Sequence, residues 1–101
     1  MTNTYTIEIT SQALADLLDM TEWYYLQRVG LEQEFILSYE AALNRLPSNP
    51  LGYSLGYKKS RSIFLQRFPY KIIFGVYGSI IKVYAVYHHS RNPTLIRKPI
   101  K

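Results

Sequence analysis

The stretch YKIIFGVYGSIIKVYAVYH, residues 70–88, decides the fold. Apolar side chains alternate on both sides of Gly78 and Ser79, which is the pattern of two strands joined by a two-residue turn with glycine first. Such a turn sets the register of the hairpin and places three apolar pairs on one face. These pairs are Val76 with Ile81, Phe74 with Val83, and Ile72 with Ala85. We expect this face to pack against the core.

The opposite face of the hairpin is mixed in character. It combines cationic, aromatic and aliphatic side chains with the small Gly75. The same register places on it Lys71, Ile73, Gly75, Tyr77, Ile80, Lys82, Tyr84, Val86 and His88. Because an antiparallel sheet can leave one face uncovered, we expect this face to be open to a partner.

Two helices are predicted upstream of the hairpin. The first begins at a Thr10 or Ser11 cap and ends near Gly30, since glycine commonly follows a helix. Its positions at helical spacing are Leu14, Leu17, Leu18, Thr21 and Tyr25. The second begins near Leu31 and ends before Pro47, which cannot continue a helix. Its apolar stripe is Leu31, Phe35, Tyr39, Ala42, Leu43 and Leu46.

Two further strands are predicted. In residues 4–10, apolar residues alternate with polar ones, and residues 62–68, SIFLQRF, also read as a strand. The element order is then β-α-α-β-β-β. This order predicts an α+β fold in which a helical hairpin covers one face of a small, mainly antiparallel sheet. A chain of 101 residues is expected to form one domain over residues 1–101.

Charge is distributed unevenly along the chain. Lysine and arginine number 12 against seven acidic residues. Every acid lies before residue 51, with Glu40 the last, whereas ten of the basic residues lie after residue 50. A basic half of this kind attracts polyanions such as nucleic acid or an acidic protein segment, and a bias for solubility is the simpler alternative.

Composition also excludes several classes of site. The sequence has no cysteine, so disulfides, thiolate metal sites and thiol nucleophiles are excluded. The first ten residues, MTNTYTIEIT, lack the basic and apolar regions of a signal peptide. No apolar run approaches the ~20 residues of a membrane span. We therefore expect a cytoplasmic protein with no membrane partner.

The motif RFPYKIIFGVYGSIIKVYAVYHHSRNP, residues 67–93, resembles the strand region of RelE/ParE-superfamily toxins of type II toxin–antitoxin (plasmid stabilisation) modules. The segments EWYY (22–25) and GLEQEFILSYEAALNRLPSNP (30–50) resemble the helical hairpin of the same superfamily. The resemblance implies a growth-arresting toxin. RelE-like members cleave mRNA on the ribosome, ParE-like members poison DNA gyrase, and some have no proven activity.

Cleavage of mRNA requires a base for the 2′-hydroxyl, a cation for the phosphorane and an acid for the leaving oxygen. We assign acid–base work to His88, because imidazole exchanges protons near neutral pH. We assign the phosphate to Arg61, Arg67 and Arg91, because guanidinium binds phosphate in bidentate fashion. The simpler alternatives are that His88 is an exposed strand-end residue and that Arg67 supports the scaffold. No carboxylate follows Glu40 to serve as a base.

Five further residues are predicted to bind nucleic acid: Lys58, Lys59, Lys71, Lys82 and Tyr84. Lysines attract phosphates, and a tyrosine ring can stack on bases. For Lys58 and Lys59, a solvated basic loop is the simpler alternative. No metal and no cofactor are expected, because the adjacent His88 and His89 point to opposite sides of a strand and make a poor metal pair.

The first functional expectation is therefore a toxin that acts as a metal-independent endoribonuclease on ribosome-bound mRNA. The second is a non-enzymatic inhibitor of DNA gyrase, in which the WYY segment (23–25) belongs to a protein-binding surface. The third is a toxin homologue without activity. In each case the resemblance implies a cognate antitoxin whose acidic or amphipathic segment wraps the toxin.

Overall fold

The computed structural model describes residues 4–88. Two helices follow the first strand, and three short 3-10 turns between residues 46 and 59 lead into the remaining strands. The elements are β1 (Thr6–Ile9), α1 (Ser11–Gln27), α2 (Leu31–Arg45), β2 (Arg61–Phe64), β3 (Tyr70–Tyr77) and β4 (Ile80–His88). The predicted α+β class and the β-α-α-β-β-β order are confirmed.

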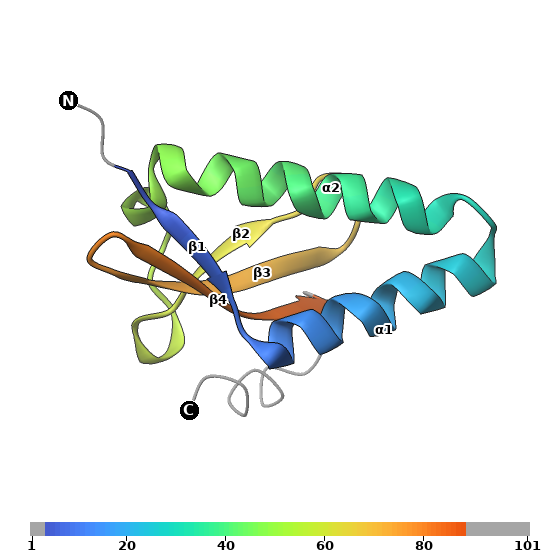
Figure 1. The fold of residues 1–101 in the computed structure, drawn as a ribbon, viewed down its shortest axis with the longest axis horizontal. Helices are drawn as coiled ribbons and strands as arrows, with labels where there is room; N and C mark the ends of the chain where they lie inside the picture. The colour runs from blue at the N-terminus through green and yellow to red at the C-terminus, as the bar shows by residue number, and fades with distance from the viewer. Residues whose placement is uncertain (1–3, 89–101) are drawn as a thin grey trace.

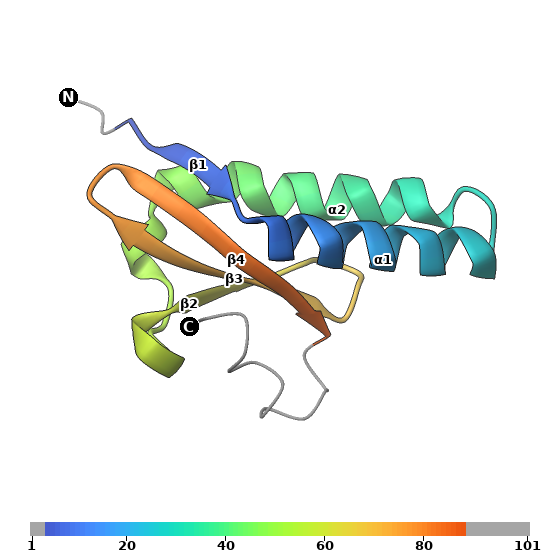
Figure 2. The same cartoon turned by 60° about the horizontal axis from the view of Figure 1, so that its bottom comes forward.

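The four strands form one sheet in the order β1-β4-β3-β2. β1 runs parallel to β4, and the other neighbours are antiparallel. Both helices lie side by side over the same face of the sheet (Figure 1). In residues 4–88, no helix covers the opposite face (Figure 2), which we name the open face. No helix in this described part of the chain is long and apolar enough to cross a membrane.

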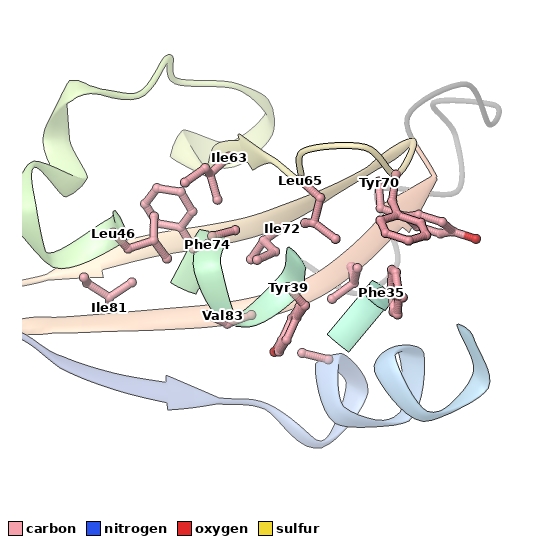
Figure 3. Packing of buried hydrophobic residues seen from close by; sticks show 14 of the residues in the cluster. Phe35, Tyr39, Leu46, Ile63, Leu65, Tyr70, Ile72, Phe74, Ile81 and Val83 are labelled. Carbon is pink, nitrogen blue, oxygen red and sulfur yellow. The ribbon is translucent and has the colours of Figure 1, made fainter. Parts of the chain in front are cut away.

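The core lies between the helices and the β3–β4 hairpin. As predicted, α2 turns its apolar stripe inward, burying Phe35, Tyr39, Ala42 and Leu46. The hairpin contributes Ile72, Phe74, Ile81 and Val83. Figure 3 shows the larger of these side chains, such as Phe35, Leu46 and Phe74, gathered between α2 and the sheet. Each large apolar side chain removed from water in this way stabilises the fold by about 1.5–3 kcal/mol.

The buried side of α1 differs from the prediction. Leu17 packs against the core as predicted, but Leu14, Leu18 and Tyr25 are exposed, and the core receives Ala13, Met20 and Tyr24 in their place. The ring of Tyr24 packs with Phe35, Phe68 and Tyr70, with ring centroids 5.1 to 6.1 Å apart. The helix has two apolar stripes at helical spacing. The one that carries Tyr24 is buried because it completes this aromatic cluster.

The junction between β1 and α1 depends on Thr10. Its hydroxyl oxygen accepts a hydrogen bond from the Ala13 N–H (3.1 Å), which confirms the predicted helix cap. The same hydroxyl donates to the Tyr84 carbonyl (3.0 Å), and the Thr10 N–H donates to the Val83 carbonyl (3.0 Å). The start of α1 is therefore fixed to the middle of β4.

The register of the hairpin follows the prediction only near the turn. Phe74 lies opposite Val83, but the pairing shifts between Ile73 and Phe74, so that Ile72 lies opposite Val86 rather than Ala85. Tyr84 is the extra residue of this β-bulge. Beyond it every β4 side chain changes face, because successive side chains on a strand alternate.

Because of the bulge, the predicted faces of three β4 side chains were wrong. Val86 enters the core, whereas Ala85 packs with Ile73 on the open face. His88 lies opposite Tyr70 and therefore faces the helices, not the open face. The start of α1 explains the shift. β1 ends opposite Val83, and the cap residue Thr10 and then Asp16 of α1 supply the hydrogen-bond partners of β4 residues 84 and 86.

Two predicted boundaries also change. The predicted strand over residues 62–68 is shorter, because the chain turns after β2. Leu65 N–H donates to the Tyr70 carbonyl (2.9 Å), and Arg67 adopts a positive φ of 74°. α1 ends at Gln27, three residues before Gly30. Gly30, at φ 98°, instead precedes the first residue of α2, in a conformation that favours glycine.

Candidate functional site

His88 lies at the end of β4 beside a cavity of about 710 Å³. Its ring meets the Tyr70 ring edge-on, with centroids 5.2 Å apart. The cavity separates α1 from the ends of β3 and β4, and we name it the α1 cavity. It is lined by Asp16, Asp19, Met20, Trp23, Tyr24, Pro69, Tyr70 and His88.

The two carboxylates of the α1 cavity have different surroundings. Asp16 is held in place: Oδ1 accepts from Gln12 Nε2 (2.8 Å) and Oδ2 accepts from the Val86 N–H (3.1 Å). Asp19 is exposed and makes no hydrogen bond or ion pair with the described residues. The cavity thus has one carboxylate engaged in the fold and one available to a ligand.

Two tyrosine hydroxyl groups near the cavity, those of Tyr24 and Tyr87, have raised pKa values. Burial first, and then the neighbouring Tyr70 hydroxyl, raises the pKa of Tyr24 to about 12. Burial and then the charge of Asp16 raise the pKa of Tyr87. Tyr24 is therefore a phenol at neutral pH, and the negative charge of the α1 cavity comes from its two aspartates.

Arg61 supports a loop in the structure. It lies opposite Phe74 on the helix-covered side of β2. Its guanidinium donates to the carbonyl oxygens of Leu51 (3.1 Å) and Tyr53. These bonds hold the segment between α2 and β2 against the sheet.

Arg67 lies in the turn between β2 and β3 and pairs with α2. Its guanidinium donates to Glu34 Oε1 (2.7 Å) and lies over the Phe68 ring, 5.6 Å from its centroid. The hydrogen bond from Arg67 is the largest cause of the lowered pKa of Glu34. This placement agrees with the simpler alternative that Arg67 supports the scaffold. Its partner is the carboxylate of Glu34 in α2.

The described residues assigned to mRNA cleavage are thus in three different environments. Arg61 binds a loop, Arg67 binds α2, and His88 lines the α1 cavity. Arg91, like His89, lies outside the described residues. Within residues 4–88, no group of three or more His, Asp or Glu residues could hold a metal ion.

The residues assigned to nucleic-acid binding divide into two groups. Lys71, Lys82 and Tyr84 share the open face, as predicted. Lys71 Nζ is 6.0 Å from the centroid of the Phe64 ring. Lys58 and Lys59 lie in an exposed loop before β2, with positive φ angles of 52° and 62°.

Two tyrosines cover the middle of the open face. The Tyr77 and Tyr84 hydroxyls contact each other above Gly75. A Cβ atom at position 75 would come within 2.9 Å of Tyr84 Oη. Glycine therefore leaves room for both rings above β3, on the same face as Lys71 and Lys82.

The α1 cavity itself was not predicted from the sequence. Asp16, Asp19 and Trp23 follow one another at spacings of three and four residues, so they share one side of α1. That spacing was the available signal. What it did not reveal is that Pro69, Tyr70 and His88 would face the same side, since this depends on the bulge in β4.

Comparison with known proteins agrees with this fold and with the sequence motifs. Residues 7–93 match the model of a family described as the ParE toxin of the type II toxin–antitoxin system parDE. The chain belongs to the ParE toxin family. The matched range includes every residue of the α1 cavity and all four strands except Thr6. Membership in this ParE family confirms the superfamily resemblance and implies a cognate antitoxin as a partner.

Solved structures share this fold, and one of them is a chain from the "Chromosomal ParDE TA system from P. aeruginosa", with a TM-score of 0.76 and 18% sequence identity. The match covers 86% of this chain and 98% of that one. A search of curated protein sequences gives no match.

Proposed function

We propose that this ParE-family toxin arrests growth by binding DNA gyrase in the cytoplasm, without cleaving mRNA. The observation that carries the proposal is the placement of Arg61, Arg67 and His88. The two arginines hold a loop and a helix, and His88 faces α1. General acid–base catalysis of phosphodiester cleavage requires such groups around one phosphate. These three positions favour the non-enzymatic alternative.

The outer surface of α1 supports binding to a protein. Leu18 is 59% exposed, and Trp23, Tyr25 and Leu26 are each at least half exposed. Large apolar side chains gathered on one helix are typical of protein interaction sites. Of the WYY segment predicted for the gyrase alternative, Trp23 and Tyr25 are exposed, whereas Tyr24 is buried in the core. The same surface and the basic half of the chain suit the amphipathic, acidic antitoxin segment expected from the sequence.

A second candidate, cleavage or binding of mRNA, is favoured by the open face. Lys71, Lys82 and Tyr84 combine phosphate attraction with an aromatic surface on which bases can stack. Under this alternative the basic residues of the face would contact RNA directly. Their replacement would then abolish activity, which separates the two candidates.

The test uses two sets of substitutions to glutamine. Leu18→Gln alters the exposed side of α1, and Lys71→Gln with Lys82→Gln alters the open face. Each purified variant is assayed for inhibition of gyrase supercoiling and, by primer extension, for mRNA cleavage during cell-free translation. The proposal expects inhibition of supercoiling that weakens with Leu18→Gln and persists in the double lysine variant.

The opposite result supports the second candidate. New mRNA ends that appear only during translation and disappear in the double lysine variant, together with normal supercoiling, would refute the gyrase proposal. Intact mRNA with inhibited supercoiling would refute cleavage.

A further inference from the structure

The α1 cavity differs in charge from the rest of this basic protein. The chain has a net charge of +5, yet the cavity is lined by two aspartates and, within the described residues, by no lysine or arginine. An anionic nucleic acid would be repelled here. The electrostatics of the cavity therefore favour a cationic ligand.

Aromatic rings form the walls of the α1 cavity. Tyr24 and Tyr70 are 8% and 5% exposed and are fixed by the aromatic cluster of the core. Trp23 is 54% exposed and meets Tyr24 edge-on, with centroids 5.1 Å apart. One side of the indole is thus supported and the remainder is available. Cations bind favourably over aromatic faces, best over tryptophan.

The carboxylates determine the geometry of binding. Asp16 is held by Gln12 and by the Val86 N–H, so its charge is fixed near the wall. Asp19, one turn further along α1, has no partner among residues 4–88 and can accept two parallel hydrogen bonds. A planar guanidinium can stack on an aromatic ring while it donates to a carboxylate, which an ammonium group does less well.

We propose that the α1 cavity is a binding site for an arginine side chain of a partner polypeptide, in which Asp19 accepts from the guanidinium and Trp23 stacks on it. Asp16 adds attraction, and Tyr70 with His88 closes the inner end. The inference is independent of whether the toxin acts on gyrase or mRNA, because it concerns only the chemistry of this cavity. A bare metal ion is not the expected ligand, since the described residues contain no cluster of three metal ligands.

Trp23 makes a direct test possible, because it is the only tryptophan in the chain. The full chain, made by cell-free synthesis with ¹⁵N-labelled tryptophan, gives one indole N–H resonance. Acetyl-Gly-Arg-Gly-amide is titrated at constant ionic strength while this resonance is followed. The proposal expects a saturable shift. The same peptide with citrulline, which has a similar shape and no charge, is expected to give no saturable shift.

Two variants with the same change of charge separate the site from general electrostatics. Asp19→Asn should weaken binding of the arginine peptide about tenfold, as expected for loss of a hydrogen bond between charged groups. Glu22→Gln, on the same helix but outside the cavity, should leave binding unchanged. Asp19 is exposed and unpaired among the described residues. Its replacement should therefore leave the fold unchanged, and the NMR spectrum of the free variant should resemble that of the natural chain.

Three results would overturn the proposal. The first is no saturable shift with the arginine peptide. The second is an equal shift with the citrulline peptide. The third is equal weakening by Asp19→Asn and Glu22→Gln, which would indicate attraction to the negative charge of α1 in general.

Discussion

The two halves of the β3–β4 hairpin differ in what determines their strand register. Near the Gly78–Ser79 turn, the pairing of Phe74 with Val83 is the one that the turn dictates. Past Ile73, the pairing shifts by one residue, and Val86 takes the core position expected for Ala85. The turn half is determined by its own sequence. The distal half also depends on Thr10 and Asp16, which are distant in sequence and bind to β4 at the bulge.

This difference has a consequence for function. A regular register would put His88 on the open face beside Lys71 and Tyr84, where RNA could reach all three. The shifted register puts His88 opposite Tyr70 and into the α1 cavity. One extra residue therefore separates the imidazole from the basic face and places it among aspartates and aromatic rings.

The largest expected effect lies in the turn half. Phe74→Ala should lower the free energy of unfolding by about 3–5 kcal/mol, because it empties a fully buried site between β3 and α2. Phe64→Ala, on the open face where the ring is 53% exposed, should cost less than about 1 kcal/mol. Urea denaturation measures both. Equal costs would contradict the assignment of the two faces.

The next effect compares the two halves directly. Val86→Ala and Val83→Ala should each cost about 2 kcal/mol, because the bulge buries both valines in the core. In a regular register Val86 would lie on the open face, and its truncation would cost much less than that of Val83. Urea denaturation of the two variants therefore reports which register the distal half adopts.

A smaller effect concerns the origin of the bulge. Thr10→Ala should cost about 1–2 kcal/mol, because α1 loses its cap and the Tyr84 carbonyl loses its donor. Thr10→Ser, which keeps the hydroxyl, should restore most of this stability, and Ser11→Ala serves as a control. Thermal denaturation gives the comparison. If serine at position 10 is no better than alanine, the hydroxyl does not fix the junction.

The smallest effect concerns the turn between β2 and β3. The lowered pKa of Glu34 means that its pairing with Arg67 stabilises the fold above the ordinary carboxyl pKa of 4.5. That contribution is lost as the pH falls through the lowered value, because the folded state then binds the proton. The difference in unfolding free energy between the natural chain and Glu34→Gln should therefore shrink on acidification from about pH 7 to pH 3. A difference independent of pH would exclude this ion pair as its source.

Much of the fold could be predicted because its signals are local. The apolar stripe of α2, the cap at Thr10 and the pairing beside Gly78 each depend on a few neighbouring residues. The buried side of α1 could not be read in this way, since Leu14 and Ala13 both lie at helical spacing. Only the aromatic cluster around Tyr24 decides between them.

The candidate site was harder to predict than the fold. Residue type and approximate strand position suggested a joint role for Arg61, Arg67 and His88. The structure gives each a different partner: loop carbonyls, Glu34, and the α1 cavity. The alternation of apolar residues cannot reveal a one-residue shift in register, because Ala85 and Val86 are both apolar and either could occupy the core position. The placement of His88 therefore required the tertiary contacts of Thr10 and Asp16.

The most direct test of this account is a nuclear Overhauser measurement across β3 and β4. We expect cross-strand contacts from the backbone protons of Ile72 to those of Val86, and from Tyr70 to His88, as the shifted register requires. Contacts from Ile72 to Ala85 and from Tyr70 to Tyr87 would contradict it. They would return His88 to the open face and restore the case for RNA cleavage there.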